Sequence, residues 1–124
     1  MTQENEILRI VYRDFNARNI DAVISRMHPQ VEWANGMEGG HVHGKEEVHA
    51  YWTRQFTTLD PNVEPVRIER DELGNWVVEV HQVVHDTKGN LLLDTTVYHT
   101  YQFREGLIAR MDIAHEKAQT GKNQ

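Results

Sequence analysis

The stretch that decides the fold is Leu91–Arg104, with the sequence LLLDTTVYHTYQFR. Its odd-numbered positions are mostly apolar or aromatic, whereas most of its even-numbered positions are polar. An alternation with a period of two predicts a β-strand with one apolar face. A single histidine, His99, interrupts this apolar face near its middle.

A second strand, Trp76–Asp86, is predicted just before this one, and its even-numbered positions are the more apolar. The link between the two strands contains Lys88-Gly89, a pair typical of a two-residue hairpin turn. Such a turn would pair Thr87 with Asn90. The two stretches therefore predict an antiparallel hairpin.

This register sets His99 opposite Val78 and puts Gln82 on the face that carries His99. We prefer it because it brings the two apolar faces together. A slip of one residue would turn the other face inward, and the polar residues on that face are Glu79, His81 and His85.

Composition sets limits on the class of protein. The chain has 124 residues, enough for one domain with one core. We expect that core over about residues 4–115, followed by a polar tail over 116–124. The net charge of −6 argues against nucleic acid or an anionic membrane as the main partner. The absence of cysteine excludes disulfides and thiolate chemistry. With neither a signal peptide nor an apolar run that could span a bilayer, a cytoplasmic protein is expected.

Apolar residues at helical spacing predict three helices, over Glu4–Ala17, from Ile20 to about His28, and from Gly44 to Leu59 with Asp60-Pro61-Asn62 as its end. Further strands are predicted at Val31–Asn35, Pro65–Asp71 and Leu107–Ala114, with a glycine-rich loop at Gly36–Gly44. Helices gathered on one face of an antiparallel sheet form an α+β fold. Burial of the helical stripes on the apolar sheet face would enclose His99 and Gln82.

Four stretches, taken with the order of the elements, carry a resemblance to a known family: FNARNID (15–21), HPQVEW (28–33), GKEEV (44–48) and VYHTYQFREGLIAR (97–110). They resemble the nuclear-transport-factor-2-like superfamily, and within it the SnoaL-like and ketosteroid-isomerase-like proteins. The resemblance covers about Glu4 to His115. It implies a cone-shaped, cystatin-like curved antiparallel sheet whose concave face is covered by the three helices. It also implies a pocket there and a homodimer formed through the sheets.

The resemblance also implies positions for a site. In ketosteroid-isomerase-like members a carboxylate base ends the first strand, and an acid on the penultimate strand binds the oxyanion. The matching positions here are Trp33 and His99. Trp33 cannot accept a proton, so the chain departs from the isomerase pattern at the base. A tyrosine of the first helix, which assists the acid, matches Tyr12 or its neighbour Val11.

Three hypotheses for function follow. The first is a cofactor-independent enzyme of isomerase, cyclase or dehydratase type, acting on a hydrophobic carbonyl compound such as a polyketide-like or steroid-like ring. His99 would be its catalytic residue, because a buried neutral histidine can act as a base or donate a hydrogen bond. The expected substrate-binding residues are Tyr12, Trp33, Trp52, Phe56, Gln82, Met111 and His115. The others are a non-catalytic binding module and a dimerisation domain with a filled cavity; a core histidine is the competing interpretation of His99.

A metal site is not expected. His41 and His43, with Glu47 four residues later, resemble the first half of a cupin metal motif. That motif needs its histidine pair on a strand and a second segment with another histidine, whereas here Gly44 begins a predicted helix. We expect this loop to act as a flap at the mouth of the pocket.

Overall fold

The computed structural model describes residues 4–35 and 39–116, and the chain forms three helices and six strands within them. The helices are α1 (Glu4–Asn16), α2 (Ile20–Ile24) and α3 (Gly44–Gln55). The strands are β1 (Met27–Ala34), β2 (His41–His43), β3 (Leu59–Arg70), β4 (Trp76–Asp86), β5 (Leu91–Arg104) and β6 (Leu107–Ala114). The sequence predicted β4, β5 and β6 with these bounds.

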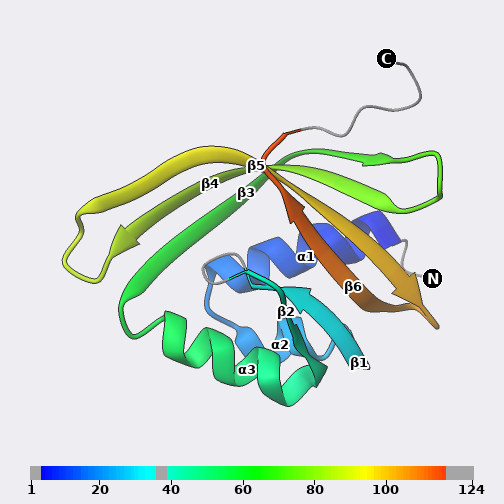
Figure 1. The fold of residues 1–124 in the computed structure, drawn as a ribbon, viewed down its shortest axis with the longest axis horizontal. Helices are drawn as coiled ribbons and strands as arrows, with labels where there is room; N and C mark the ends of the chain where they lie inside the picture. The colour runs from blue at the N-terminus through cyan, green and yellow to red at the C-terminus, as the bar shows by residue number, and fades with distance from the viewer. Residues whose placement is uncertain (1–3, 36–38, 117–124) are drawn as a thin grey trace.

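The six strands form one sheet in the order β2-β1-β6-β5-β4-β3. Figure 1 shows that this sheet is strongly curved and that the three helices lie on its concave side. The predicted α+β architecture is confirmed. One strand pair differs from the antiparallel expectation, because β1 runs parallel to β6.

The predicted register of the central hairpin is confirmed, although its turn is not. Val78 lies opposite His99. The predicted pairing of Thr87 with Asn90 is wrong, because the backbone N–H of Asp86 donates to the Asn90 carbonyl instead. The resulting offset is removed by a bulge at Leu92, where the partners change from His85 with Leu91 to Val84 with Leu93. A one-residue bulge of this kind shifts the pairing by one position, so the two local differences cancel along the rest of the hairpin.

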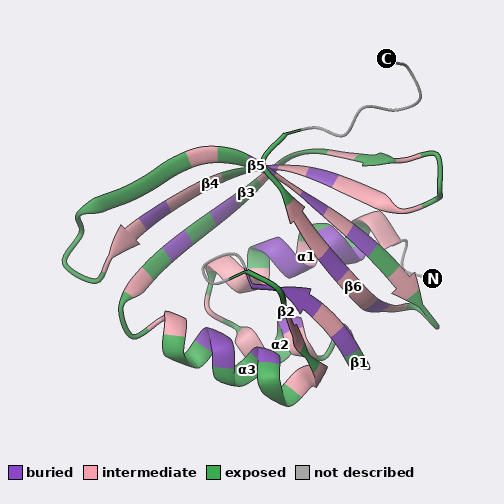
Figure 2. Ribbon diagram, viewed as in Figure 1, coloured by how far each residue is buried: buried purple, intermediate pink, exposed green. Residues whose placement is uncertain are grey.

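Apolar stripes attach the helices to the concave face. In α1 the buried residues are Ile7, Leu8, Val11 and Tyr12, and in α3 they are Val48, Tyr51 and Trp52. These spacings place each set on one side of its helix. Figure 2 shows buried residues on both helices and on the strands beside them. None of the helices in the described ranges is long and apolar enough to cross a bilayer.

The predicted second helix is too long. It ends at Ile24, and Met27 already begins β1. Met27 fits both a helical stripe and a strand, and the choice is made by its pairing with Ile108 of β6, where both side chains are fully buried. The parallel partner lies about 80 residues away along the chain, so local periodicity contains no sign of it.

The predicted third helix is also too long, and the strand after it is too short. Helix α3 ends at Gln55, and Leu59 begins β3, six residues before the predicted start. Pro61 and Pro65 lie inside this strand. Proline lacks the N–H that an inner strand needs, but β3 is at the edge of the sheet, where proline is tolerated.

Two predicted irregular segments are only partly described. The glycine-rich loop contains a short strand, because His41–His43 pairs antiparallel with β1. Residues 36–38, part of the predicted flap, lie outside the described residues, and so do residues 117–124 of the predicted polar tail.

The outer edge of β3 is held by a side chain of α1. The amide of Asn16 donates from Nδ2 to the Val63 carbonyl at 2.8 Å and accepts at Oδ1 from the Val63 N–H at 2.9 Å. The amide thereby takes the place of a neighbouring strand at this residue. It ties the end of α1 to the sheet edge.

We expect Asn16→Ala to lower the free energy of unfolding by about 1–3 kcal/mol, because it leaves both polar backbone groups of Val63 without these partners. Urea unfolding followed by circular dichroism measures the change. Asn19→Ala is the matched control, since Asn19 is exposed and its side chain makes no capping hydrogen bond. Equal stability losses in the two variants would contradict the role of the Asn16 amide.

Candidate functional site

A cavity of about 130 Å³ lies between the helices and the concave face of the sheet. Seven of the eight residues predicted for the site line it: Tyr12, Trp33, Trp52, Gln82, His99, Met111 and His115. Six of them come from two helices and four strands, and His115 directly follows β6. The sheet curvature and the helical stripes therefore gather one set of side chains from across the whole sequence.

Phe56 is the predicted site residue that does not line this cavity. It packs behind the lining on Phe15, with a distance of 5.6 Å between ring centroids. The guanidinium of Arg18 stacks over the Phe56 ring, 4.6 Å from its centroid. Phe56 lies one helical turn beyond Trp52 at the end of α3. Its ring packs against Phe15 and Arg18, and Phe15 lines the cavity in its place.

Other lining residues were not singled out from the sequence. They include Phe15, Tyr51, Gln55 and Leu93. Phe15 lies one turn beyond Tyr12 on the predicted helical stripe, so the stripe itself indicated it. Gln55 follows Tyr51 at helical spacing, and its amide donates to the Tyr51 hydroxyl at 3.1 Å.

Aromatic rings form the wall of the cavity on the side of β1. Trp33 meets Trp52 edge to face, with 5.4 Å between ring centroids, and meets Tyr101 in the same manner at 6.1 Å. All three side chains are at least 93% buried. Rings that interlock in this way have few ways to move apart without losing contact area.

A chain of hydrogen bonds connects His99 to two tyrosines. The hydroxyl of Tyr101 donates to the hydroxyl oxygen of Tyr12 at 2.8 Å, and the distance from that oxygen to Nδ1 of His99 is 2.7 Å. Since Tyr12 accepts from Tyr101, its own proton is directed to His99. In the tautomer that accepts this proton at Nδ1, the proton of the neutral imidazole lies on Nε2.

Burial keeps this imidazole uncharged. It lowers the pKa of His99 from 6.5 to about 4, because removing water penalises the charged form. Burial also raises the pKa of Tyr12 and of Tyr101, so both hydroxyls keep the protons that these hydrogen bonds need. At neutral pH, His99 is a neutral group that offers one N–H donor, on Nε2.

The other polar groups of the cavity are neutral or lie at its mouth. Gln82 is half-buried, and its amide has no hydrogen-bond partner within residues 4–35 and 39–116. His115 is exposed and lines the cavity from the end of β6, on the face of Met111 and Ile113, as predicted. No Asp, Glu, Lys or Arg is among the described residues that line the cavity. The site is thus apolar and aromatic, with a few neutral hydrogen-bonding groups.

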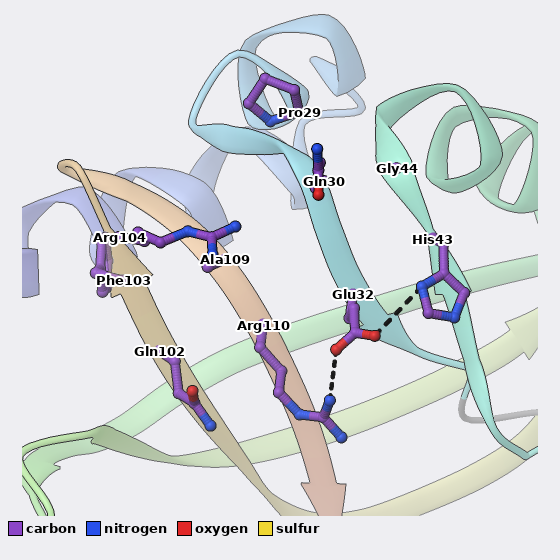
Figure 3. Close-up of a pocket in the computed structure, with 10 residues that line it drawn as sticks. All are labelled: Pro29, Gln30, Glu32, His43, Gly44, Gln102, Phe103, Arg104, Ala109 and Arg110. Atoms are coloured by element: carbon purple, nitrogen blue, oxygen red, sulfur yellow. Dashed lines mark hydrogen bonds and ion pairs between the residues drawn. The ribbon is translucent and has the colours of Figure 1, made fainter.

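A second concavity, about 850 Å³, is a groove on the opposite face of the sheet (Figure 3). Glu32 and Arg110 lie on this face because their neighbours Trp33 and Met111 point into the cavity. Arg110 donates to the Glu32 carboxylate at 2.6 Å, and Nδ1 of His43 lies 3.3 Å from the same carboxylate. The groove is lined mostly by polar and charged side chains, so the apolar, aromatic cavity under the helices is the better candidate for a small-molecule site.

The histidine pair of the predicted flap belongs to this outer face. Nε2 of His41 lies 2.9 Å from the Asp112 carboxylate, and the N–H of His43 donates to Glu47 at 3.0 Å. His41 and His43 are on a strand, contrary to the sequence-based reason for setting a metal aside. Across the described ranges, no group of three His, Cys, Asp or Glu side chains has the geometry to hold a metal ion.

The depressed pKa of His99 predicts a loss of stability in acid. Between pH 6.5 and about pH 4 the unfolded chain takes up a proton at His99 that the folded chain does not, so stability falls as the pH falls through this window. The full effect is on the order of 3 kcal/mol. We expect the wild type to lose this amount relative to His99→Gln, by urea unfolding at a series of pH values.

His49→Gln, at an exposed histidine of α3, is the control for this experiment. Parallel pH profiles for the wild type and His99→Gln would show that His99 charges in the folded protein, which would contradict its neutral state.

Comparison with known proteins shows which domains and structures this fold is similar to. A model of the SnoaL-like domain matches residues 8–111. An NTF2-like protein of unknown function from Burkholderia pseudomallei K96243 superposes with a TM-score of 0.80 at 22% identity, over 94% of this chain and 92% of that one. TerC, crystallised with polyporic acid, superposes with a TM-score of 0.77 at 24% identity, over 90% and 89% of the two chains.

A third structure, of a proposed polyketide cyclase from Pseudomonas putida KT2440, has a TM-score of 0.75 at 15% identity over 94% and 93% of the two chains. At these identities the structures are similar in fold. No protein of curated function matches the chain in sequence. The family model covers most of the chain, including His99 and Met111, and the chain therefore belongs to the SnoaL-like domain family.

Proposed function

We propose that this protein binds an apolar carbonyl compound in the enclosed cavity and acts on it by cofactor-independent acid–base chemistry. The observation that carries the proposal is the buried hydrogen-bond chain from Tyr101 through Tyr12 to His99. Burial keeps His99 neutral, and the hydrogen bond from Tyr12 orients its ring beside an aromatic cavity. A pre-oriented neutral donor suits a carbonyl oxygen.

The proposed step is enolisation, which isomerases and cyclases of carbonyl compounds share. Nε2–H of His99 donates to the carbonyl oxygen. As the carbon next to the carbonyl loses its proton, negative charge grows on this oxygen and the hydrogen bond strengthens. The donor thus favours the enolate-like transition state over the ketone.

A base must accept the proton. Trp33 occupies the position where ketosteroid-isomerase-like members have a carboxylate, and the described lining contains no acidic side chain. His115, the other histidine that lines the cavity, is our candidate base. It is exposed at the mouth, so a proton taken up there can pass to solvent.

The second candidate function is a binding module without chemistry. The missing carboxylate favours it, because a hydrogen-bond donor alone would hold a ligand without removing a proton. Gln82 fits either function, since its half-buried amide has an unused capacity for hydrogen bonds within the described ranges.

We expect the protein to accelerate exchange of the α-protons of cyclohexanone for deuterium in D₂O, followed by proton NMR. Exchange reports enolisation directly and needs no knowledge of the natural substrate. His99→Phe and His115→Gln should each lower the rate by about 10²–10⁴-fold, the range for loss of a general acid or base. His81→Gln, on the outer face of β4 with its ring bonded to Asp94, is the control.

Two results separate the functions. Exchange that depends on both His99 and His115 supports the enzyme. Ligand binding without faster exchange than in protein-free buffer would reject the chemistry and leave the binding module.

The homodimer implied by the family resemblance stays a prediction. We expect a species with twice the mass of the 14.5 kDa chain in sedimentation velocity. A single species of monomer mass at micromolar concentration would contradict it.

A further inference from the structure

The size of the cavity limits the ligand. About 130 Å³ is close to an engineered apolar cavity of about 150 Å³ that holds one benzene molecule, and it lies well below the roughly 300–1,000 Å³ of sites for larger ligands. A single six-membered ring fits this volume. A fused polycyclic ring, which the sequence alone suggested, does not.

The walls that set this size are closely packed. Trp33 and Trp52 interlock edge to face, and Met111 closes the space between β1 and β5 with only 2% of its surface exposed. Enlarging the cavity to accept a second ring would separate these contacts, and a well-packed interior resists such a change.

The charge of the ligand is limited as well. No Lys or Arg is among the described residues that line the cavity, and His99 is neutral. A carboxylate that entered would lose its water without gaining a cation from this wall, which disfavours its binding. An ammonium group would lack an acidic partner in the same set of residues.

Polar contacts fix one end of the ligand. Nε2–H of His99 is available because Tyr12 occupies Nδ1, and it requires an acceptor atom. Gln82 offers an amide to the same face of the sheet. The ring then packs against Trp33 and Trp52.

We propose, on the basis of the function proposed above, that the ligand is an uncharged single-ring compound with one oxygen that accepts a hydrogen bond from His99. Its natural form is a monocyclic ketone or a neutral aromatic carbonyl compound.

The three tryptophans provide the test. Two of them, Trp33 and Trp52, line the cavity, whereas Trp76 lies outside it with its indole N–H donating to Glu4 at 2.8 Å. In ¹⁵N-labelled protein each indole gives one N–H signal, and Trp76→Phe identifies the internal control by its disappearance. The ligands are cyclohexanone, 1-decalone and androstenedione, with one, two and four rings.

We expect cyclohexanone to shift the signals of Trp33 and Trp52 and to leave that of Trp76 unchanged. The two larger ketones should bind at least about tenfold more weakly or produce no shift, corresponding to 1.4 kcal/mol or more. Benzamide and benzoate form the matched pair for charge at pH 7, since they have the same ring and differ in charge. Benzamide should shift the two signals, and benzoate should not.

Other results overturn the inference in distinguishable ways. Tighter binding of 1-decalone or androstenedione at the two wall indoles would reject the size limit and retain the proposed pocket. Equal binding of benzoate would reject the charge limit alone. If no ketone or amide of any size shifts Trp33 or Trp52, both this inference and the proposed function fail.

Discussion

The pairing of β4 with β5 is the constraint on which the rest of the structure depends. It brings Val78, Val80 and Val97 together on the concave face, each no more than 1% exposed. The same register places His99 inside that face, opposite Val78. A buried imidazole requires a partner for its acceptor nitrogen, and Tyr12 of α1 supplies it. Strand register, helix position and the polar centre of the cavity are therefore one coupled arrangement.

Burial gives the histidines of this chain different roles on the two faces of the sheet. On the concave face His99 loses its water and its pKa falls to about 4, so the ring is uncharged at neutral pH. On the convex face His41 and His43 are paired with the carboxylates of Asp112 and Glu32. Residues that are two positions apart along a strand share a face, and adjacent residues do not, so one strand such as β6 contributes to both environments.

The cavity and its chemistry follow from the same packing. Aromatic side chains from α1, α3, β1 and β5 fill most of the space under the sheet, and what remains is the size of one ring. Trp33 stands where the ketosteroid-isomerase pattern has a carboxylate, and its ring forms part of the cavity wall. Under the proposed function, this tryptophan goes with a smaller ligand and with His115 as the base. The family fold alone would indicate neither, since one fold supports many activities.

The sequence by itself determined the α+β class, the bounds of β4, β5 and β6, and the apolar face with His99 at its centre. These features rest on local alternation and helical spacing, which are properties of neighbouring residues. Tertiary structure decided what depends on distant partners. Met27 joined a strand because β6 lies beside it, and Pro61 was accepted because β3 is at the edge of the sheet. The hydrogen-bond partner of His99 and the volume of the cavity likewise depend on how α1 packs against β5. A hydrogen bond between residues 87 positions apart has no signature in the local sequence.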